Sequence, residues 1–472
     1  MNRIVVMKFG GSSVAGTERL RGVAALARAR AAKGDAVLLV LSAMSKVTDS
    51  LFAAGRAAES RDEAAALATF EEIIGRHEAA AAELFGGDPP EAVKAALARA
   101  REEIVPVLRG AALLGTLPER SKDLLVGRGE LLSTALLAAY MEATWLDART
   151  VLRTDSRFGQ ARPRPEAIKH LASFTLLPLL GPGRIVVTQG YIGADDAGVP
   201  TTLGRGGSDY SASLFGAAIE AAEIQIWTDV EGVLTGDPRV VEGARPVEIL
   251  GYDEAAELAA FGAKVLHPAT ILPAVELGIP VTVRNTMLPE GKFTTISKES
   301  ASGLPVTALA SRGPVTVVTV RNPRMLGGAG FLSRIFEVFG RRGVSVDLVS
   351  TSEVSVSVTV DEGAAQLEAL VAELGSFADV RVEKDRAIVA LVGEELKRTP
   401  GVTGAAFGAL RDINVEMISL GSNEINLSLV VALKDAAEAQ RRLHAALFGS
   451  AATALFGSAD TAVAGSSRKE GS

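Results

Sequence analysis

Lys8 interrupts an apolar run near the start of the chain, and two glycines and two serines follow that run in the stretch VVMKFGGSS at residues 5–13. Glycines let a backbone approach an oxyanion closely, and a lysine adds a positive charge. The segment can therefore hold a phosphate in a chain that contains neither a P-loop nor a G-x-G-x-x-G pattern. Taken alone, Lys8 is equally well explained as a strand lysine that extends to solvent.

Arg205 is surrounded by three glycines in a second segment, TTLGRGGSDYSA at residues 201–212. We expect Ser208 to be the N-cap of a helix and Asp209 to lie in its first turn, so that helix N–H groups and a guanidinium converge on one loop. Such an arginine suits a bidentate grip on a carboxylate or phosphate. The alternative is a surface loop with a capping aspartate.

Three further segments carry polar or charged side chains of kinds that are found in binding sites. The stretch WTDVEGVLTGDPR at 227–239 either holds a nucleotide base and ribose or is a turn-rich connection. Lys264 lies on an apolar, helix-like stretch from which it could reach phosphates, whereas His267 is more typical of a packed or capping histidine. Glu130 stands at a glycine-rich helix start, where alone it is a partner for the helix dipole.

Buried strands alternating with helices must position these residues. We expect strands at 4–9, 36–42, near 150, 184–193, 223–230 and 280–285, and helices at 18–32, 46–109 with a break at 86–90, 129–143 and 208–222. This order predicts an α/β fold with a mainly parallel sheet between helix layers. Ligands bind beyond the carboxyl ends of such strands, where several of these segments fall.

The pattern changes after residue 294, where strands alternate apolar and polar residues. The order strand, helix, strand, strand, helix, strand is indicated twice, which predicts two ferredoxin-like α+β units in tandem. Their strands are expected at 313–322, 344–361, 387–394, 417–423 and 425–433, and their helices at 331–343 and 401–415. After about residue 448 the composition predicts a disordered tail.

Composition excludes several classes of function. The 472 residues carry 49 Lys and Arg against 56 Asp and Glu, a net charge of -7, which argues against a nucleic-acid partner. The absence of cysteine excludes disulfides, thiolate metal sites and a cysteine nucleophile. With no leader-like start and no continuous apolar stretch long enough for a membrane span, we expect a soluble, cytoplasmic protein with no membrane partner.

The chain resembles aspartokinases from residue 4 to about 448. The resemblance lies in motifs in the family's order: KFGGSSV at 8–14, GE at 129–130, LGRGGSD at 203–209, WTDV at 227–230, DPR at 237–239 and FGAKVLHP at 261–268. The segments RMLGGAGFL at 324–332 and VSVDLVSTSEVSV at 344–356 resemble those of the single-function, lysine-sensitive branch.

This resemblance implies an amino-acid-kinase fold followed by two ACT domains. We expect a catalytic domain at 1–300, a first ACT domain at 313–386, a second at 387–448 with a strand from 304–311, and the disordered tail at 449–472. It also implies the reaction of L-aspartate with ATP, accompanied by Mg²⁺ on the nucleotide, to give 4-phospho-L-aspartate and ADP. No protein-bound metal is expected.

Site residues follow from the matching positions. Lys8, Asp209 and Lys264 are expected to be catalytic, with Asp209 orienting Lys8 or assisting the metal. Arg205 would pair with the α-carboxylate of aspartate and Glu130 with its ammonium group. Hydroxyl contacts would come from Ser42, Thr48 and Ser208. The nucleotide would be held by Lys8, Phe9, Gly10, Gly11, Thr228, Asp229, Leu234, Arg239, Lys264 and Val265.

An amino-acid effector, expected to be L-lysine, is implied at an interface between ACT domains of two chains. Its lining positions are Met325, Gly328, Phe331, Leu332, Ser345, Val346, Asp347, Thr351, Ser352 and Glu353. Asp347 and Glu353 match the two ammonium groups of lysine. By pattern alone this segment is also compatible with an ordinary half-buried strand pair, and threonine, methionine and S-adenosylmethionine are alternative effectors. A homodimer is expected, with a tetramer as the alternative.

The sequence departs from the family pattern at three places. Ser12 replaces a common Thr, Leu234 replaces a common Tyr near the nucleotide, and Gly127-Arg128 replaces the usual Ser-His. Two other functions stay open: a kinase of the same fold acting on glutamate, acetylglutamate, carbamate or UMP, and a noncatalytic amino-acid sensor. The Glu130 and Arg205 pair and the tandem ACT units favour aspartate.

Overall fold

The computed structural model describes residues 3–262, 268–298, 305–323, 330–361, 366–420 and 424–449. The chain divides into two compact units, one of Met1–Val233 with Val265–Lys298 and one of Leu234–Lys264 with Glu299–Ser472. Residues 234–264 thus belong to the second unit, although they precede the end of the predicted catalytic domain. The predicted domain boundaries stay a prediction.

A mainly parallel sheet forms the centre of the first unit. Its strands occur in the order β3 (Thr144–Leu146), β4 (Ile185–Gln189), β2 (Ala36–Leu41), β1 (Ile4–Phe9), β7 (Glu223–Thr228), β9 (Val281–Asn285) and β10 (Thr294–Ser297). β10 alone of these runs antiparallel to its neighbour, β9. Lys8 lies in register with Val40 of β2 and Ile226 of β7, so the carboxyl ends of these strands meet at one edge.

Helices cover both faces of this sheet, as the alternating pattern predicts. Alternate residues of β1 and β2 pack against α1 (Thr17–Ala31) and α6 (Arg128–Met141) in one core. On the other face lies α8 (Gly207–Ala218), where Gly216 approaches Ile224 and Val6. Two more helices of the first unit are α7 (Pro165–Thr175) and α10 (Pro268–Glu276).

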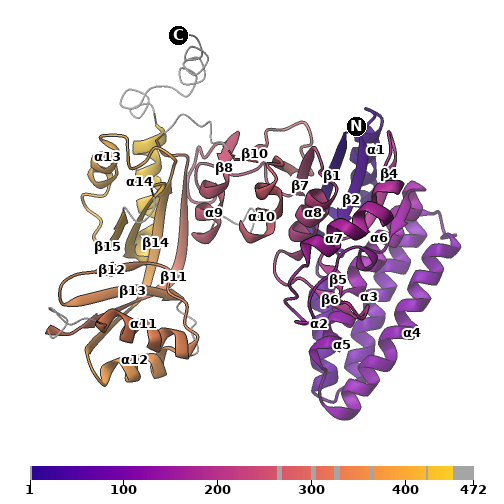
Figure 1. Cartoon of the computed structure of the whole chain (residues 1–472), viewed down its shortest axis with the longest axis horizontal. Helices are drawn as coiled ribbons and strands as arrows, with labels where there is room; N and C mark the ends of the chain where they lie inside the picture. Colours follow the sequence, from indigo (N-terminus) through magenta and orange to yellow (C-terminus); the bar gives the residue numbers. More distant parts are fainter. Residues whose placement is uncertain are drawn as a thin grey trace, which may run out of the picture. The chain divides into compact units, whose positions relative to one another are not determined.

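Four further helices lie side by side with α6 and build a second core (Figure 1). They are α2 (Val47–Glu59), α3 (Glu63–Leu84), α4 (Glu91–Leu114) and α5 (Glu119–Val126). The predicted break at 86–90 is present between α3 and α4, but a second break at 60–62 was missed. Asp62 caps α3 there by accepting a hydrogen bond from the N–H of Ala65 at 3.0 Å.

One helical stretch, Glu119–Met141, is long and apolar enough to cross a membrane by length and composition. Some 72% of its most apolar window is buried inside the protein, and it comprises α5 and α6 with a break at Gly127. The stretch therefore packs as core helices, and its apolar composition is explained by that burial.

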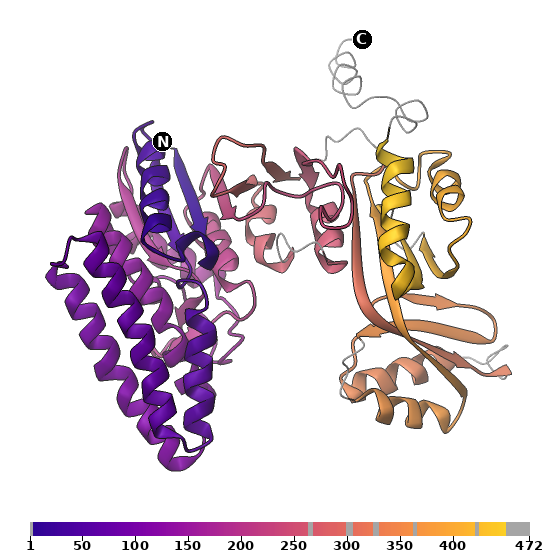
Figure 2. The ribbon, with the colours of Figure 1, turned by 180° about the vertical axis from the view of Figure 1, so that it is seen from behind.

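The second unit contains an antiparallel sheet in the order β12 (Val349–Thr351), β13 (Ser355–Asp361), β11 (Ala308–Arg321), β14 (Asp379–Val392), β16 (Asn426–Ala432) and β15 (Val415–Leu420). The long strands β11 and β14 run through both ferredoxin-like halves (Figure 2). One half packs α11 (Phe331–Arg342) and α12 (Leu367–Gly375) on the sheet; the other packs α13 (Val402–Ala409) and α14 (Ala436–Phe448). Strand β8 (Ile249–Gly251) and helix α9 (Tyr252–Ala260) also belong to this unit.

The fold class predicted from the sequence is confirmed, with local corrections. The strand expected near residue 150 lies earlier, at β3, and a short 3₁₀ helix occupies Ala148–Thr150. Residues 344–348 are not a regular strand. Residues 308–311 pair with 389–392, so this piece of β11 belongs to the sheet of the second ferredoxin-like half.

Candidate active site

Lys8 lies at the carboxyl end of β1, where it forms an ion pair with Asp209. The Nζ to Oδ1 distance is 2.6 Å, and Lys8 is only 8% exposed. A lysine buried to this extent needs such a partner, because an unpaired ammonium group is costly to remove from water. The pair thus fixes the ammonium group at the edge of the sheet.

The glycines after Lys8 lie close to other parts of the chain, where a larger side chain would crowd its neighbours. A Cβ on Gly11 would lie 3.1 Å from the carbonyl oxygen of Ala43, and one on Gly10 would lie 3.4 Å from Lys8 Nζ. The Gly10 N–H donates to the carbonyl of Trp227 at 3.4 Å. Phe9 is fully buried and stacks on Trp227 with ring centroids 5.6 Å apart, so its side chain faces the core. Any ligand contact by Phe9 must therefore involve its backbone.

Helix α8 brings Ser208 and Asp209 to this edge. The helix begins at Gly207 after Gly206 in the left-handed conformation (φ 71°), so the prediction of Ser208 as N-cap is wrong. Ser208 and Asp209 instead lie within the first turn, where Ser42 Oγ donates to Ser208 Oγ at 2.9 Å. A left-handed N-cap favours glycine, which accounts for the second glycine of the segment.

Glu130 is a buried carboxyl without a cationic partner among the described residues. It is 3% exposed, Oε1 accepts a hydrogen bond from the Ala43 N–H at 3.3 Å, and Oε2 has no hydrogen-bond partner in the described ranges. Burial raises its pKa to about 8, against the hydrogen bond from Ala43. A cation beside Oε2 would favour ionisation, so the environment suits an ammonium group.

The approach of Glu130 to the loop after β2 depends on residues beside it. A Cβ on Gly129 would lie 2.6 Å from Ala43 Cβ, so only glycine lets α6 come this close. Ser133 Oγ donates to the Ser42 carbonyl at 2.9 Å and fixes the same loop. Ser133 was not predicted; its spacing of three residues from Glu130, which places both on one helix face, was the available signal.

Arg205 and Thr48 stand apart from these contacts. Arg205 is exposed and has neither an ion pair nor a hydrogen bond within the described part of the chain. Thr48 lies half-buried in the first turn of α2. The structure therefore brings together Lys8, Ser42, Glu130, Ser208 and Asp209, and their predicted roles stay predictions.

The predicted nucleotide residues are spread over both units. Thr228 ends β7, and its hydroxyl donates to Asp229 Oδ1 at 3.2 Å. Leu234 and Arg239 belong to the second unit, where Arg239 pairs with Asp237 at 2.7 Å. Lys264 and Val265 lie outside the described residues.

Asp347 is the most constrained of the predicted effector residues. It pairs with Arg312 at 2.9 Å, while its buried Oδ2 has no hydrogen-bond partner among the residues that the structure describes. Burial raises the pKa of Asp347, and the Arg312 charge opposes this shift. The Phe331 ring packs edge-on against Phe377 at 5.9 Å.

The other predicted effector residues are less constrained. Ser352 Oγ and Ser355 Oγ are hydrogen-bonded at 2.8 Å. Val346 is half-buried, and the exposed members of the set are Leu332, Ser345, Thr351, Ser352 and Glu353. Met325 and Gly328 lie outside the described residues.

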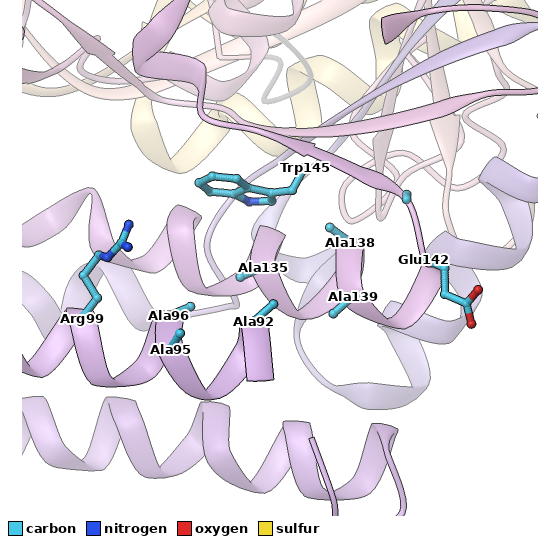
Figure 3. A pocket seen from close by; sticks show the side chains of 10 residues that line it. Ala92, Ala95, Ala96, Arg99, Ala135, Ala138, Ala139, Glu142 and Trp145 are labelled. Atoms are coloured by element: carbon cyan, nitrogen blue, oxygen red, sulfur yellow. The ribbon is translucent and has the colours of Figure 1, made fainter. Parts of the chain in front are cut away.

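Two further features lie outside the candidate site. A surface groove of about 320 Å³ runs between α4, α6 and β3, lined by alanines with Trp145, Arg99 and Glu142 (Figure 3). Its lining includes none of the predicted site residues that the structure describes. Within the described ranges no group of three His, Asp or Glu side chains is arranged to hold a metal ion.

Comparison with known proteins identifies the family. The amino acid kinase family model matches residues 3–285, and an ACT domain model matches residues 318–370 and 389–447. The chain is 39% identical over 460 residues to lysine-sensitive aspartokinase 3 of Escherichia coli (strain K12), covering 95% of this chain and 100% of the relative.

Comparison with solved structures supports the same family. The structure resembles E. coli aspartokinase III in complex with lysine and aspartate (T-state), with a TM-score of 0.78 and 38% identity over 94% of this chain and 99% of the other. It also resembles that enzyme in complex with aspartate and ADP (R-state), with a TM-score of 0.79 and 38% identity over 94% of this chain and 100% of the other. With this identity over the whole relative, and an amino acid kinase region followed by ACT domains, the chain belongs to the aspartokinase family.

Proposed function

We propose that this chain transfers the γ-phosphoryl group of ATP to the side-chain carboxylate of L-aspartate, giving 4-phospho-L-aspartate and ADP. The observation that carries this proposal is the placement of two buried groups at one sheet edge: the Glu130 carboxyl, which has no cationic partner among the described residues, and the Lys8 ammonium group, which pairs with Asp209. Membership of the aspartokinase family supports it. The reaction would supply the first intermediate of lysine, threonine and methionine synthesis.

The proposed chemistry fits these side chains. The nucleophile is a carboxylate that is already ionised at neutral pH, so no general base is required. Phosphoryl transfer then depends on positioning and on stabilisation of the negative charge that develops on the transferred oxygens. Lys8 supplies positive charge at the strand end, and Asp209 holds its ammonium group in place.

The ends of the substrate would be fixed by different segments. Glu130 would accept the α-ammonium group and Arg205 the α-carboxylate, with hydroxyl contacts from Ser42, Thr48 and Ser208. Mg²⁺ is expected to arrive on the ATP phosphates, since this ion is usually held by one or two carboxylates together with substrate phosphates. Asp209 is the carboxylate beside Lys8 that could assist it.

We further propose that L-lysine inhibits the enzyme by binding at the ACT region, and that the chain acts in the cytoplasm as a homodimer. The buried Oδ2 of Asp347 supports an ammonium site, because within the described part of the chain it lacks a hydrogen-bond partner. Asp347→Asn should raise the lysine concentration needed for half-inhibition while leaving uninhibited turnover unchanged. Lysine inhibition that is identical in this variant would contradict the assignment of Asp347.

A substrate panel tests the reaction itself. ADP release should be measured with MgATP and each of aspartate, glutamate, acetylglutamate, carbamate and UMP. Turnover with aspartate far above that with the other four is expected. Preferred turnover of another compound would assign a different kinase activity, and ATP binding without any turnover would favour a sensor.

A further inference from the structure

Asp123 is a buried carboxylate that joins two separate segments of the first unit. It lies on α5, is 2% exposed and accepts hydrogen bonds from Gly159 and Thr202. The Gly159 N–H is 3.0 Å from both carboxylate oxygens, while the Thr202 N–H and hydroxyl are 2.9 Å from Oδ2 and Oδ1. Four such contacts account for burial of a carboxyl that has no ion pair within the described ranges.

The two segments that Asp123 joins adjoin residues 203–207, the loop that carries Arg205 and is called the Arg205 loop below. Thr202 ends β6 (Pro200–Thr202), three residues before Arg205, and its carbonyl accepts from the Ala161 N–H at 2.9 Å. Gly204 is left-handed (φ 77°), and a Cβ there would lie 3.2 Å from the Gly159 carbonyl oxygen. The backbone that leads into Arg205 is therefore held between β6 and the segment around Gly159.

Asp123 also connects this loop to Glu130. Asp123 and Glu130 lie on consecutive helices, α5 and α6, which meet at Gly127. Under the proposed function Glu130 takes the ammonium group and Arg205 the α-carboxylate, two groups on the same carbon of aspartate. Arg205 itself has no hydrogen bond or ion pair within the described residues, so its position depends on the backbone that carries it.

We propose that Asp123 is a positioning residue that sets the place of the Arg205 loop relative to Glu130 and thereby the affinity for the amino-acid substrate. This inference rests on the proposed function. Removing the carboxylate would leave the N–H groups of Gly159 and Thr202 without their acceptor. The loop would then be free to move, and aspartate binding would weaken more than nucleotide binding or phosphoryl transfer.

Asp195 offers a matched control on the same β5–β6 hairpin, where β5 is Ile192–Ala194. It is also buried and accepts hydrogen bonds from the N–H groups of Ala197 and Val199 and from Ser156 Oγ. These contacts hold the turn at the far end of the hairpin from Thr202. Asp123→Ala and Asp195→Ala therefore each remove a buried carboxylate, but only Asp123 lies at the Arg205 loop.

Steady-state kinetics of both variants in the full-length protein test the proposal. Asp123→Ala should raise the KM for aspartate by about tenfold or more, with smaller changes in kcat and in the KM for ATP. Asp123→Asn, which retains one accepting oxygen, should recover part of this loss. Asp195→Ala should lower Tm without a selective change in the KM for aspartate.

Hydrogen–deuterium exchange of residues 203–207 without substrate gives a readout that does not depend on the reaction. Asp123→Ala should accelerate exchange there more than Asp195→Ala does. Unchanged exchange and KM in Asp123→Ala, or equal effects in both variants, would overturn the positioning role. If the wild type fails to phosphorylate aspartate, the proposed function falls, while the exchange comparison still decides whether Asp123 holds the loop.

Discussion

Aspartate binding should release a proton from Glu130. Burial raises the pKa of this carboxyl to about 8 in the unliganded protein. At pH 7 a group with that pKa is protonated in about nine of ten molecules, and ionisation costs about 1.4 kcal/mol. An ammonium group beside Oε2 would favour the ionised form, so binding would proceed with loss of the proton.

The size of the effect follows from the same pKa. Calorimetric titration at pH 7 in buffers of different ionisation enthalpy should show release of about 0.9 proton per aspartate bound. The dissociation constant for aspartate should fall about fivefold between pH 7 and pH 8, because the fraction of ionised Glu130 increases over that interval.

Glu130→Gln tests whether this carboxyl is the source of the proton. The variant should bind aspartate weakly, with no proton release and no pH dependence over this interval. Glu254→Gln is a matched control, because Glu254 is also buried but accepts hydrogen bonds from Gly251 and Thr307 in the second unit. Proton release that is absent in the wild type, or unchanged in Glu130→Gln, would show that Glu130 does not lose a proton when aspartate binds.

Three further substitutions test the site and the fold. Asp209→Asn should lower kcat by about 100-fold and also lower the free energy of unfolding, since the buried Lys8 loses the partner that lies 2.6 Å away; a normal kcat would contradict this. Gly129→Ala should lower the free energy of unfolding by about 1–3 kcal/mol in denaturant titrations, because its Cβ would lie 2.6 Å from Ala43 Cβ. Burial lowers the pKa of His77 to about 4, below its ordinary value of 6.5, so stability should fall by about 3 kcal/mol as pH drops from 6.5 to 4. His77→Leu should remove this loss, and equal acid sensitivity of variant and wild type would exclude His77 as its source.

The sequence predicts that segments with candidate site residues meet at one edge of the sheet, because the buried strand patterns indicate a parallel sheet in which β1 and β7 end on the same side. Lys8 and Asp209 are 201 positions apart, yet Lys8 lies near the end of a recognisable strand and Asp209 lies in the first turn of a recognisable helix. The parallel pairing of β1 with β2 and β7 then brings their motifs together. Helix capping was harder to predict, since Gly206 and Ser208 are both acceptable N-caps and only the backbone conformation distinguishes them.

Contacts made by backbone groups and by isolated acids could not be predicted in this way. The Ala43 N–H that bonds Glu130 carries no side-chain signal. In the sequence Asp123 cannot be distinguished from other acids on a polar helix. Its contact with Thr202 depends on the position of β6 in the fold. The assignment of residues 234–264 to the second unit likewise depends on tertiary contacts rather than on local composition.

Phosphorylation of aspartate is measured first through the formation of aspartyl hydroxamate by the purified protein with MgATP, aspartate and hydroxylamine. Lys8→Ala and 10 mM lysine, a concentration chosen on the order of that needed to saturate a weak effector site, provide the two comparisons. We expect hydroxamate from the wild type, near-complete loss in Lys8→Ala and a decrease with lysine. Full activity in Lys8→Ala, or ATP binding without hydroxamate from aspartate, would contradict this expectation.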